Sequence, residues 1–210
     1  MENLILDTDS YKASHWLQYP PGITGMYSYL ESRGGRYDKT VFFGLQYIMK
    51  KYLSATFTQE WVDEADEFFK AHGVPFNKDD WNYVVRDLGG KLPLTIKAVP
   101  EGTVVPTHNI LASVECYDPK AFWTVSWFET MFMRIWYPIT VATQSWHIKS
   151  DLLKWLEKSA DDPQAEINFK LHDFGSRGVS SQESAGIGGA AHLVNFMGSD
   201  TVVGTWTANK

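Results

Sequence analysis

The segment from Leu171 to Asp200 constrains the fold more than any other part of the chain. Its sequence, LHDFGSRGVSSQESAGIGGAAHLVNFMGSD, predicts the end of a strand, a loop with an arginine between two glycines, a helix, and the start of another strand. The unit expected over 167–206 has the length of a βαβ element. Because parallel strands need cover on both faces, the segment predicts an α/β fold. The unit either packs on the preceding residues or opens a longer parallel sheet or barrel.

The sequence before this segment predicts a mixed α+β domain. The alternation of Met26, Ser28 and Leu30 with two tyrosines and a glutamate is typical of a strand. Thr58 predicts the start of a helix and Gly73 its end. Helices are expected over 42–53, 58–72, 81–88, 119–137 and 140–157, and strands over 26–31, 94–99, 103–105 and 110–115.

Composition excludes some classes of function. The net charge is −6 and the basic residues are scattered, which argues against a nucleic-acid surface but allows a nucleotide-like small molecule. Cys116 is the single cysteine, so no internal disulfide is possible and a reducing, cytoplasmic location is expected. The start of the chain lacks the basic region of a secretion signal. The apolar stretch 121–142 contains Pro138 and two charged residues, so a buried helix ending near Tyr137 is predicted rather than a membrane span.

The loop from Asp173 to Gly178 is predicted to form an anion-binding corner. Its glycines let a ligand approach the backbone, and Arg177 carries a planar fork suited to phosphate. Ser180 and Glu183 fit a capping box, after which the helix N-terminus presents free N–H groups. The alternative is an ordinary capped turn with a surface arginine.

The predicted helix over 182–196 is rich in small residues. Gly186, Gly188 and Gly189 each lower helix stability by roughly 1 kcal/mol relative to alanine, so they imply that another element approaches this backbone closely. His172 and His192 are interpreted as structural histidines. The six histidines show no metal-ligand spacing, and no metal ligand is predicted.

Asp200 follows Gly198 and Ser199 and precedes the predicted strand over 201–203. It is either a turn aspartate or a carboxylate at the edge of a pocket. In the second interpretation it would accept a hydrogen bond from a ligand amide.

Several motifs together resemble one enzyme family. The segment KLHDFGSRGVSSQESAGIGGAAHLVNFMGSDT resembles the nicotinamide phosphoribosyltransferase family, which has the type II phosphoribosyltransferase fold. Five other segments are similar to that family in the same order: DTDSYKASHW with the following QYPPG, YSYLESR, VFFGLQY, LPLTIKAVPEGTVVP and WYPITVAT.

The resemblance implies a fold and an activity. The expected fold is α/β, with a mixed N-terminal domain over 1–165 packed on the first βαβ unit, 166–210, of an incomplete barrel. Members are pentosyltransferases (glycosyltransferases) of NAD biosynthesis and salvage. They transfer phosphoribosyl from phosphoribosyl pyrophosphate to nicotinamide, giving nicotinamide mononucleotide and pyrophosphate. Mg²⁺ is required, ATP is an optional energy source, and the enzyme is a homodimer. No nucleic-acid or membrane partner is expected.

The resemblance also assigns the nicotinamide site. Phe174 matches the ring on one side of nicotinamide, and Tyr11 matches the ring supplied by the other subunit. Asp200 matches the aspartate that accepts from the carboxamide. A planar pyridine gains from such stacking, and a carboxylate acceptor would repel nicotinate.

Three further positions are assigned by the same resemblance. Arg177 matches the arginine near nicotinamide and phosphate, Asp9 an acidic residue near the same pocket, and Arg33 an arginine that reaches pyrophosphate across the dimer. Catalysis at the ribose anomeric carbon needs mainly positioning and stabilisation of the departing pyrophosphate.

Family chains continue for more than about two hundred further residues, which carry a histidine phosphorylated by ATP and the loops that hold ribose. No catalytic residue is therefore assigned here, and the isolated chain is expected to be inactive without a C-terminal half. The alternatives are a non-catalytic truncated binding or interaction module, and a nicotinate phosphoribosyltransferase. The residues after Gly204 do not show a helical pattern.

Overall fold

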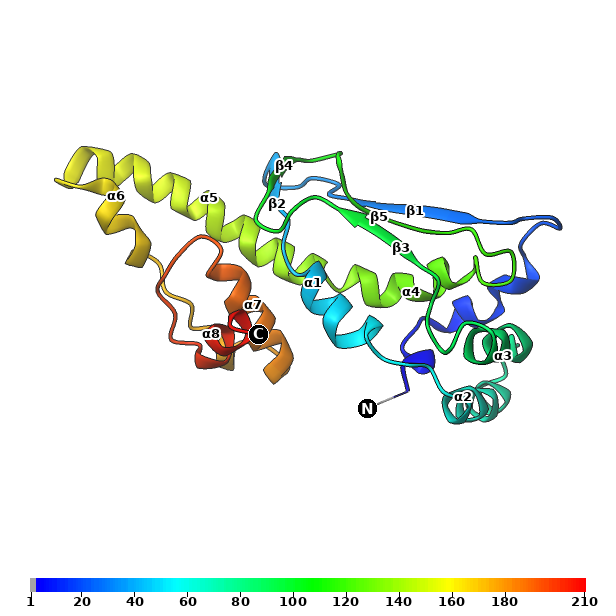
Figure 1. Ribbon diagram of the computed structural model, residues 1–210. Helices are drawn as coiled ribbons and strands as arrows, with labels where there is room; N and C mark the ends of the chain where they lie inside the picture. Colours follow the sequence, from blue (N-terminus) through cyan, green and yellow to red (C-terminus); the bar gives the residue numbers. More distant parts are fainter. Residues whose placement is uncertain (1–2) are drawn as a thin grey trace. The chain divides into compact units, whose positions relative to one another are not determined.

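The computed structural model describes residues 3–210 and contains both helices and sheets (Figure 1). Its described residues cluster into two units: 3–30 with 46–98 and 110–134, and 31–45 with 99–109 and 135–210. The predicted division into domains at residues 165 and 166 stays a prediction. The helices are α1 (Leu45–Ile48), α2 (Gln59–His72), α3 (Lys78–Arg86), α4 (Thr124–Met133), α5 (Trp136–Ser159), α6 (Pro163–Glu166), α7 (Gln182–His192) and α8 (Val202–Ala208).

The described residues also form five short helical turns and five strands. The 3₁₀-helical turns are η1 (Leu4–Leu6), η2 (Ser10–Leu17), η4 (Ile167–Phe169) and η5 (Gly175–Arg177), and η3 (Met49–Leu53) is a π-helical turn. The strands are β1 (Met26–Glu31), β2 (Lys39–Val41), β3 (Thr95–Ala98), β4 (Val104–Pro106) and β5 (Ile110–Cys116).

The first unit contains a three-stranded sheet in the order β1-β5-β3. Strands β3 and β5 are antiparallel, whereas β4 pairs with β2 in a separate sheet. Strand β5 is buried along most of its length and contacts α4. Cys116 is buried at its end, where burial raises the pKa of the thiol. The single thiol is therefore a packed apolar group rather than a reactive one.

An aromatic core lies beside this sheet. Trp81 of α3 is fully buried, and its ring contacts the rings of Phe57, Trp123 and Trp127 at centroid distances of 5.4, 5.0 and 5.1 Å. Rings at such distances add attraction to the area that they bury. These four rings form the centre of the core of the first unit.

Helix α2 begins and ends where the sequence predicts. The Thr58 side chain accepts from the backbone N–H of Trp61, and Gly73 adopts the left-handed conformation that ends the helix. Ala65 and Phe69 of this helix are buried, whereas half of the Phe68 surface is exposed.

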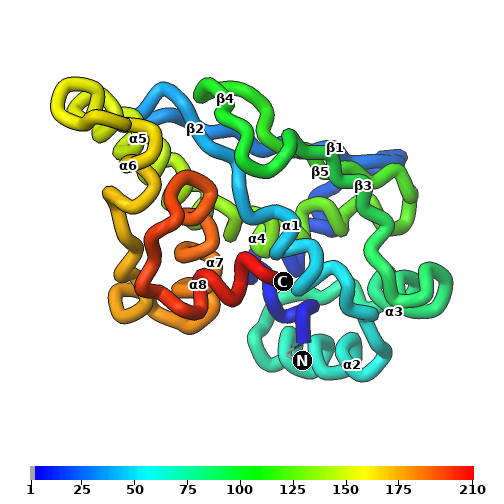
Figure 2. The backbone as a smooth tube through the Cα atoms, turned by 60° about the vertical axis from the view of Figure 1, so that its left-hand side comes forward, coloured from blue at the N-terminus to red at the C-terminus, as the bar shows by residue number. Residues whose placement is uncertain are grey.

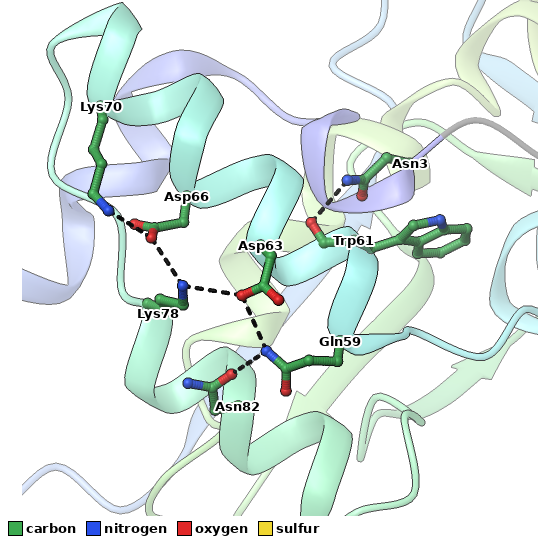
Figure 3. A network of polar contacts seen from close by, with 8 residues as sticks. All are labelled: Asn3, Gln59, Trp61, Asp63, Asp66, Lys70, Lys78 and Asn82. Carbon is green, nitrogen blue, oxygen red and sulfur yellow. Dashed lines mark hydrogen bonds and ion pairs between the residues drawn. The ribbon is translucent and has the colours of Figure 1, made fainter.

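A polar network joins α2 to the start of α3 (Figure 3). The Asp66 carboxylate accepts from Lys70 Nζ at 2.7 Å and from Lys78 Nζ at 2.9 Å. Lys78 also pairs with Asp63 at 3.0 Å. Hydrogen bonds from the two lysines lower the pKa of Asp66 below its ordinary value of 3.8.

This network predicts a contribution to acid stability. Since the pKa of Asp66 is lower in the folded state, its stabilisation is present above the unfolded pKa and is lost as pH falls through the folded value. We expect Asp66→Asn to lower the free energy of unfolding at pH 7 by about 1 kcal/mol and to have little effect near pH 2. Urea denaturation at both pH values measures this difference. An equal loss at both would contradict the assignment, and Asp161→Asn, in an exposed loop, is the control.

The second unit contains the antiparallel pair β2–β4 and the long helix α5. The backbone N–H of Val41 in β2 donates to Thr143 Oγ1 of α5 at 2.9 Å. The prediction that Pro138 ends a helix is wrong, because it lies in the first turn of α5. The N–H groups of a first turn have no partner within the helix, so proline costs little there.

Helices α7 and α8 lie side by side in the second unit, as Figures 1 and 2 both show. A Cβ added to Gly189 would lie 2.7 Å from the Cα of Gly204, and one added to Gly186 would lie 2.5 Å from Thr207 Oγ1. A Cβ on Gly188 would lie 2.6 Å from the hydroxyl of Tyr137 in α5. The predicted close approach to the three glycines is therefore confirmed.

Two predicted strands of this unit do not form. Residues 167–169 are a 3₁₀ turn, and 202–208 form α8, including the residues after Gly204 that show no helical pattern in the sequence. What remains of strand pairing is an isolated parallel bridge between Asp173 and Ser199. The apolar residues near Val202 favour a strand locally, but in the fold this segment is a helix whose Gly204 packs closely on Gly189 of α7.

Two kinds of feature are absent from residues 3–210. Within this range no helix is long and apolar enough to cross a membrane. The same residues contain no group of three histidine, cysteine, aspartate or glutamate side chains that converge as metal ligands.

Candidate functional site

The loop before α7 presents the predicted ring and arginine at the surface of the second unit. Phe174 precedes the turn η5, and 65% of its surface is exposed. Arg177 ends this turn and is also exposed. The Asp173 side chain accepts from the backbone N–H of Gly175 at 2.9 Å, which closes the loop around Phe174.

The cap of α7 differs from the predicted one by a single residue. Ser181, rather than Ser180, is the N-cap, and its Oγ accepts from the backbone N–H of Ser184 at 3.1 Å. Ser181 has the extended backbone that an N-cap requires. Glu183 therefore lies in the first turn at the second helical position and not at the position of a capping box.

Asp200, the residue predicted to accept from a ligand amide, lies beside His172 in the second unit. Asp200 Oδ2 is 3.3 Å from His172 Nδ1, and about half (54%) of the Asp200 side chain is exposed. The His172 and Phe174 rings have a centroid distance of 6.4 Å. The structure thus gathers Phe174 and Asp200 around His172, at the ends of the two segments that the parallel bridge joins.

His192 is the structural histidine that the sequence predicts. It is buried in α7, where Nδ1 is 3.0 Å from Ser145 Oγ and Nε2 is 3.0 Å from the carbonyl oxygen of Gly198. Because both ring nitrogens have a protein partner, His192 holds the 198–200 segment against α7 rather than binding a ligand.

Two predicted residues lie in the first unit. Tyr11 is on η2 with 57% of its surface exposed, and Asp9 precedes that turn. Asp9 Oδ2 accepts from Thr130 Oγ1 at 2.7 Å and from the Tyr11 hydroxyl at 3.5 Å. Partial burial and the carboxylates of Asp9 and Glu129 raise the pKa of Tyr11 above its ordinary value.

The turn that carries Tyr11 is held on α4 by its neighbour. Lys12 is buried and forms an ion pair with Glu129 of α4. A buried lysine without a partner is costly, so this pair fixes the side of η2 that faces the helix and leaves Tyr11 on the exposed side. Sequence analysis missed Lys12 and Thr130, because their roles depend on contacts between distant segments.

Arg33 lies in the second unit, in an exposed loop that includes Gly34 and Gly35. The backbone N–H of His108 donates to the carbonyl oxygen of Ser32 at 2.9 Å and holds the base of this loop. The structure therefore places Arg33 at the surface in a different segment from Phe174, Arg177 and Asp200.

Comparison with known proteins covers nearly the whole chain. Residues 3–96 match the model of the nicotinamide phosphoribosyltransferase N-terminal domain, and residues 169–209 match that of the nicotinate phosphoribosyltransferase (NAPRTase) family. A nicotinamide phosphoribosyltransferase from Xanthomonas campestris is 56% identical over 96% of this chain. The chain is similar to the N-terminal part of nicotinamide phosphoribosyltransferases. This confirms the resemblance predicted from the motifs.

More distant members of that family align over a similar range. The enzymes from Acinetobacter baylyi and Mycoplasma genitalium are 30% and 32% identical over 92% and 95% of this chain. The chain spans less than half the length of the curated relatives it matches: 43% for Xanthomonas, 42% for Acinetobacter and 49% for Mycoplasma genitalium.

Proposed function

We propose that this chain supplies the nicotinamide-binding part of a nicotinamide phosphoribosyltransferase of NAD biosynthesis. The observation that carries the proposal is the pairing of an exposed ring, Phe174, with a half-exposed carboxylate, Asp200, on adjoining segments. A ring stacks on a planar pyridine, and a carboxylate accepts from a carboxamide N–H₂. Both residues lie in the range that matches the second family model.

The second ring of this site would be Tyr11 from another copy of the chain. A ring that stacks on a ligand must be accessible, and Tyr11 is exposed on η2. Its hydroxyl donates to the Asp9 carboxylate, which also accepts from Thr130 Oγ1. A homodimer with a shared site is therefore part of the proposal, and the buried thiol of Cys116 favours a cytoplasmic location.

The arginines are proposed to bind the second substrate, phosphoribosyl pyrophosphate. Arg177 ends the turn before α7, whose N-terminus favours anions, and Arg33 is exposed in its glycine-rich loop. Mg²⁺ would arrive with the pyrophosphate as part of that substrate. ATP remains an optional energy source in this proposal.

The remainder of the reaction is proposed to need residues outside the matched range. The relatives are more than twice as long as the aligned part of this chain, or about twice as long for the mycoplasma enzymes. We propose that the parallel barrel, the ribose-binding loops and the phosphorylated histidine belong to that remainder. The bridge between Asp173 and Ser199 would mark where the first two barrel strands pair.

Asp200 should determine the preference for the amide over the acid. We expect the unmodified chain to bind nicotinamide more tightly than nicotinate, and Asp200→Asn to lower nicotinamide affinity and reduce the preference by roughly tenfold. Calorimetric titration with each ligand measures this, with Asp161→Asn as the control. Turnover with phosphoribosyl pyrophosphate and Mg²⁺ is then measured with and without a polypeptide matching the remainder of the Xanthomonas relative.

The outcomes separate the candidate functions. Preference of the unmodified chain for nicotinate would refute the role of Asp200 and favour a nicotinate phosphoribosyltransferase. Binding of nicotinamide without turnover in either mixture would favour a non-catalytic binding module. Turnover by the chain alone would refute its dependence on the remainder.

A further inference from the structure

Asp173 lies between the two candidate ligand-binding residues and contacts the segment of each. Its backbone N–H donates to the carbonyl oxygen of Gly198 at 3.4 Å, and its own carbonyl oxygen accepts from the backbone N–H of Asp200 at 2.9 Å. Thr201 Oγ1 donates to the same carbonyl oxygen at 3.4 Å. The backbone of Asp200 is therefore held through Asp173.

The Asp173 side chain holds the segment of Phe174. Oδ1 accepts from the backbone N–H of Gly175 at 2.9 Å, so the carboxylate closes a turn over the intervening Phe174. A Cβ on Gly175 would lie 2.8 Å from Oδ1, which shows how closely the carboxylate fits this turn. Hydrogen bonds to a charged acceptor are stronger than those between neutral groups.

The other carboxylate oxygen is buried and has no hydrogen-bond partner among residues 3–210. A Cβ on Gly189 of α7 would lie 3.2 Å from this Oδ2. Burial is the main cause of the raised pKa of Tyr137, and the Asp173 charge raises it further. Burying a carboxylate oxygen without a partner is costly, so the contacts that Asp173 makes through its other atoms must offset that cost.

We infer that Asp173 is a positioning residue that fixes Phe174 and Asp200 relative to each other. Its consequence for ligand binding rests on the proposed nicotinamide site. The Asp173 side chain fixes the position of the Phe174 ring, and the Asp173 backbone carbonyl oxygen fixes the position of Asp200. Removing the side chain should loosen the turn around Phe174 directly, and the resulting shift of the Asp173 backbone should reach Asp200 through the carbonyl oxygen.

Amide hydrogen exchange measured by NMR tests the positioning without a ligand. In Asp173→Ala we expect exchange at Gly175 to accelerate roughly 10- to 100-fold and exchange at Asp200 to accelerate as well. Asp173→Asn retains an oxygen acceptor and should keep exchange at Gly175 within about threefold of the unmodified chain. Asp161→Ala, in an exposed loop, should change neither amide. Unchanged exchange at both amides in Asp173→Ala would overturn the inference.

Calorimetry with nicotinamide then tests the consequence for binding. Asp173→Ala should weaken nicotinamide binding by about tenfold while the chain stays folded by circular dichroism, and Asp173→Asn should restore most of the affinity. Gly175→Ala keeps the carboxylate but crowds it, and should weaken binding in the same direction. Unchanged affinity in Asp173→Ala with altered exchange would refute the binding role. If the unmodified chain binds no nicotinamide while both amides respond, the proposed function fails and the positioning role stands.

Discussion

Gly189→Val is expected to lower the free energy of unfolding of the second unit by about 3 kcal/mol. The added side chain would start 2.7 Å from the Cα of Gly204, and a backbone atom cannot move aside as a flexible side chain can. Helices α7 and α8 would have to separate, which exposes the apolar residues between them. Urea denaturation followed by circular dichroism measures the loss.

Gly178→Ala is the matched control for this prediction. Gly178 has an ordinary right-handed backbone, and its added Cβ would meet only the carbonyl oxygen of Gly175 at 3.5 Å. A change of less than about 0.5 kcal/mol is expected. Equal stability of Gly189→Val and the unmodified chain would show that α7 and α8 do not pack as described.

Trp81→Ala should destabilise the first unit by about 4 kcal/mol. The indole is fully buried among Phe57, Trp123 and Trp127, so its removal leaves a cavity that three rigid rings cannot fill. The indole Nε1 has no partner among residues 3–210, so no hydrogen bond is lost with the ring and the expected destabilisation comes from packing alone. Thermal unfolding followed by tryptophan fluorescence is the measurement.

Trp155→Ala tests whether the effect comes from burial rather than from the loss of any tryptophan. Trp155 is 68% exposed on α5, and its ring contacts the Lys158 ammonium group at 5.0 Å. Such an exposed contact contributes at most about 1 kcal/mol. A loss in Trp155→Ala as large as that in Trp81→Ala would contradict the described core.

Local sequence signals predicted the elements whose ends depend on nearby residues. Thr58 and Gly73 bound α2 because a cap and a left-handed terminus are properties of single residues. Pro138 was misread because proline interrupts a helix interior but fits its first turn, and the sequence did not show which applied. The strand predicted around Val202 failed for a different reason, since the close contact of Gly204 with Gly189 joins segments whose pairing local propensity does not reveal.

The residues of the candidate site likewise differ in whether local sequence reveals them. Phe174, Arg177 and Asp200 could be found because they lie in a recognisable motif. The role of Asp173 could not be found, since its contacts to Gly198 and Asp200 arise only when two segments pair. Lys12 and Thr130 were missed because their partners Glu129 and Asp9 are far away in sequence.

The contact between α7 and α8 also determines how this part of the chain folds. Three glycines in α7 make it a poor helix on its own, by roughly 1 kcal/mol each. Those same glycines let α8 and Tyr137 reach its backbone. Helix α7 should therefore not persist as an early, independent helix during folding, and the two helices should form in one cooperative step. The N-terminus of α7 beside Arg177 then becomes ordered only after the chain has been made as far as α8.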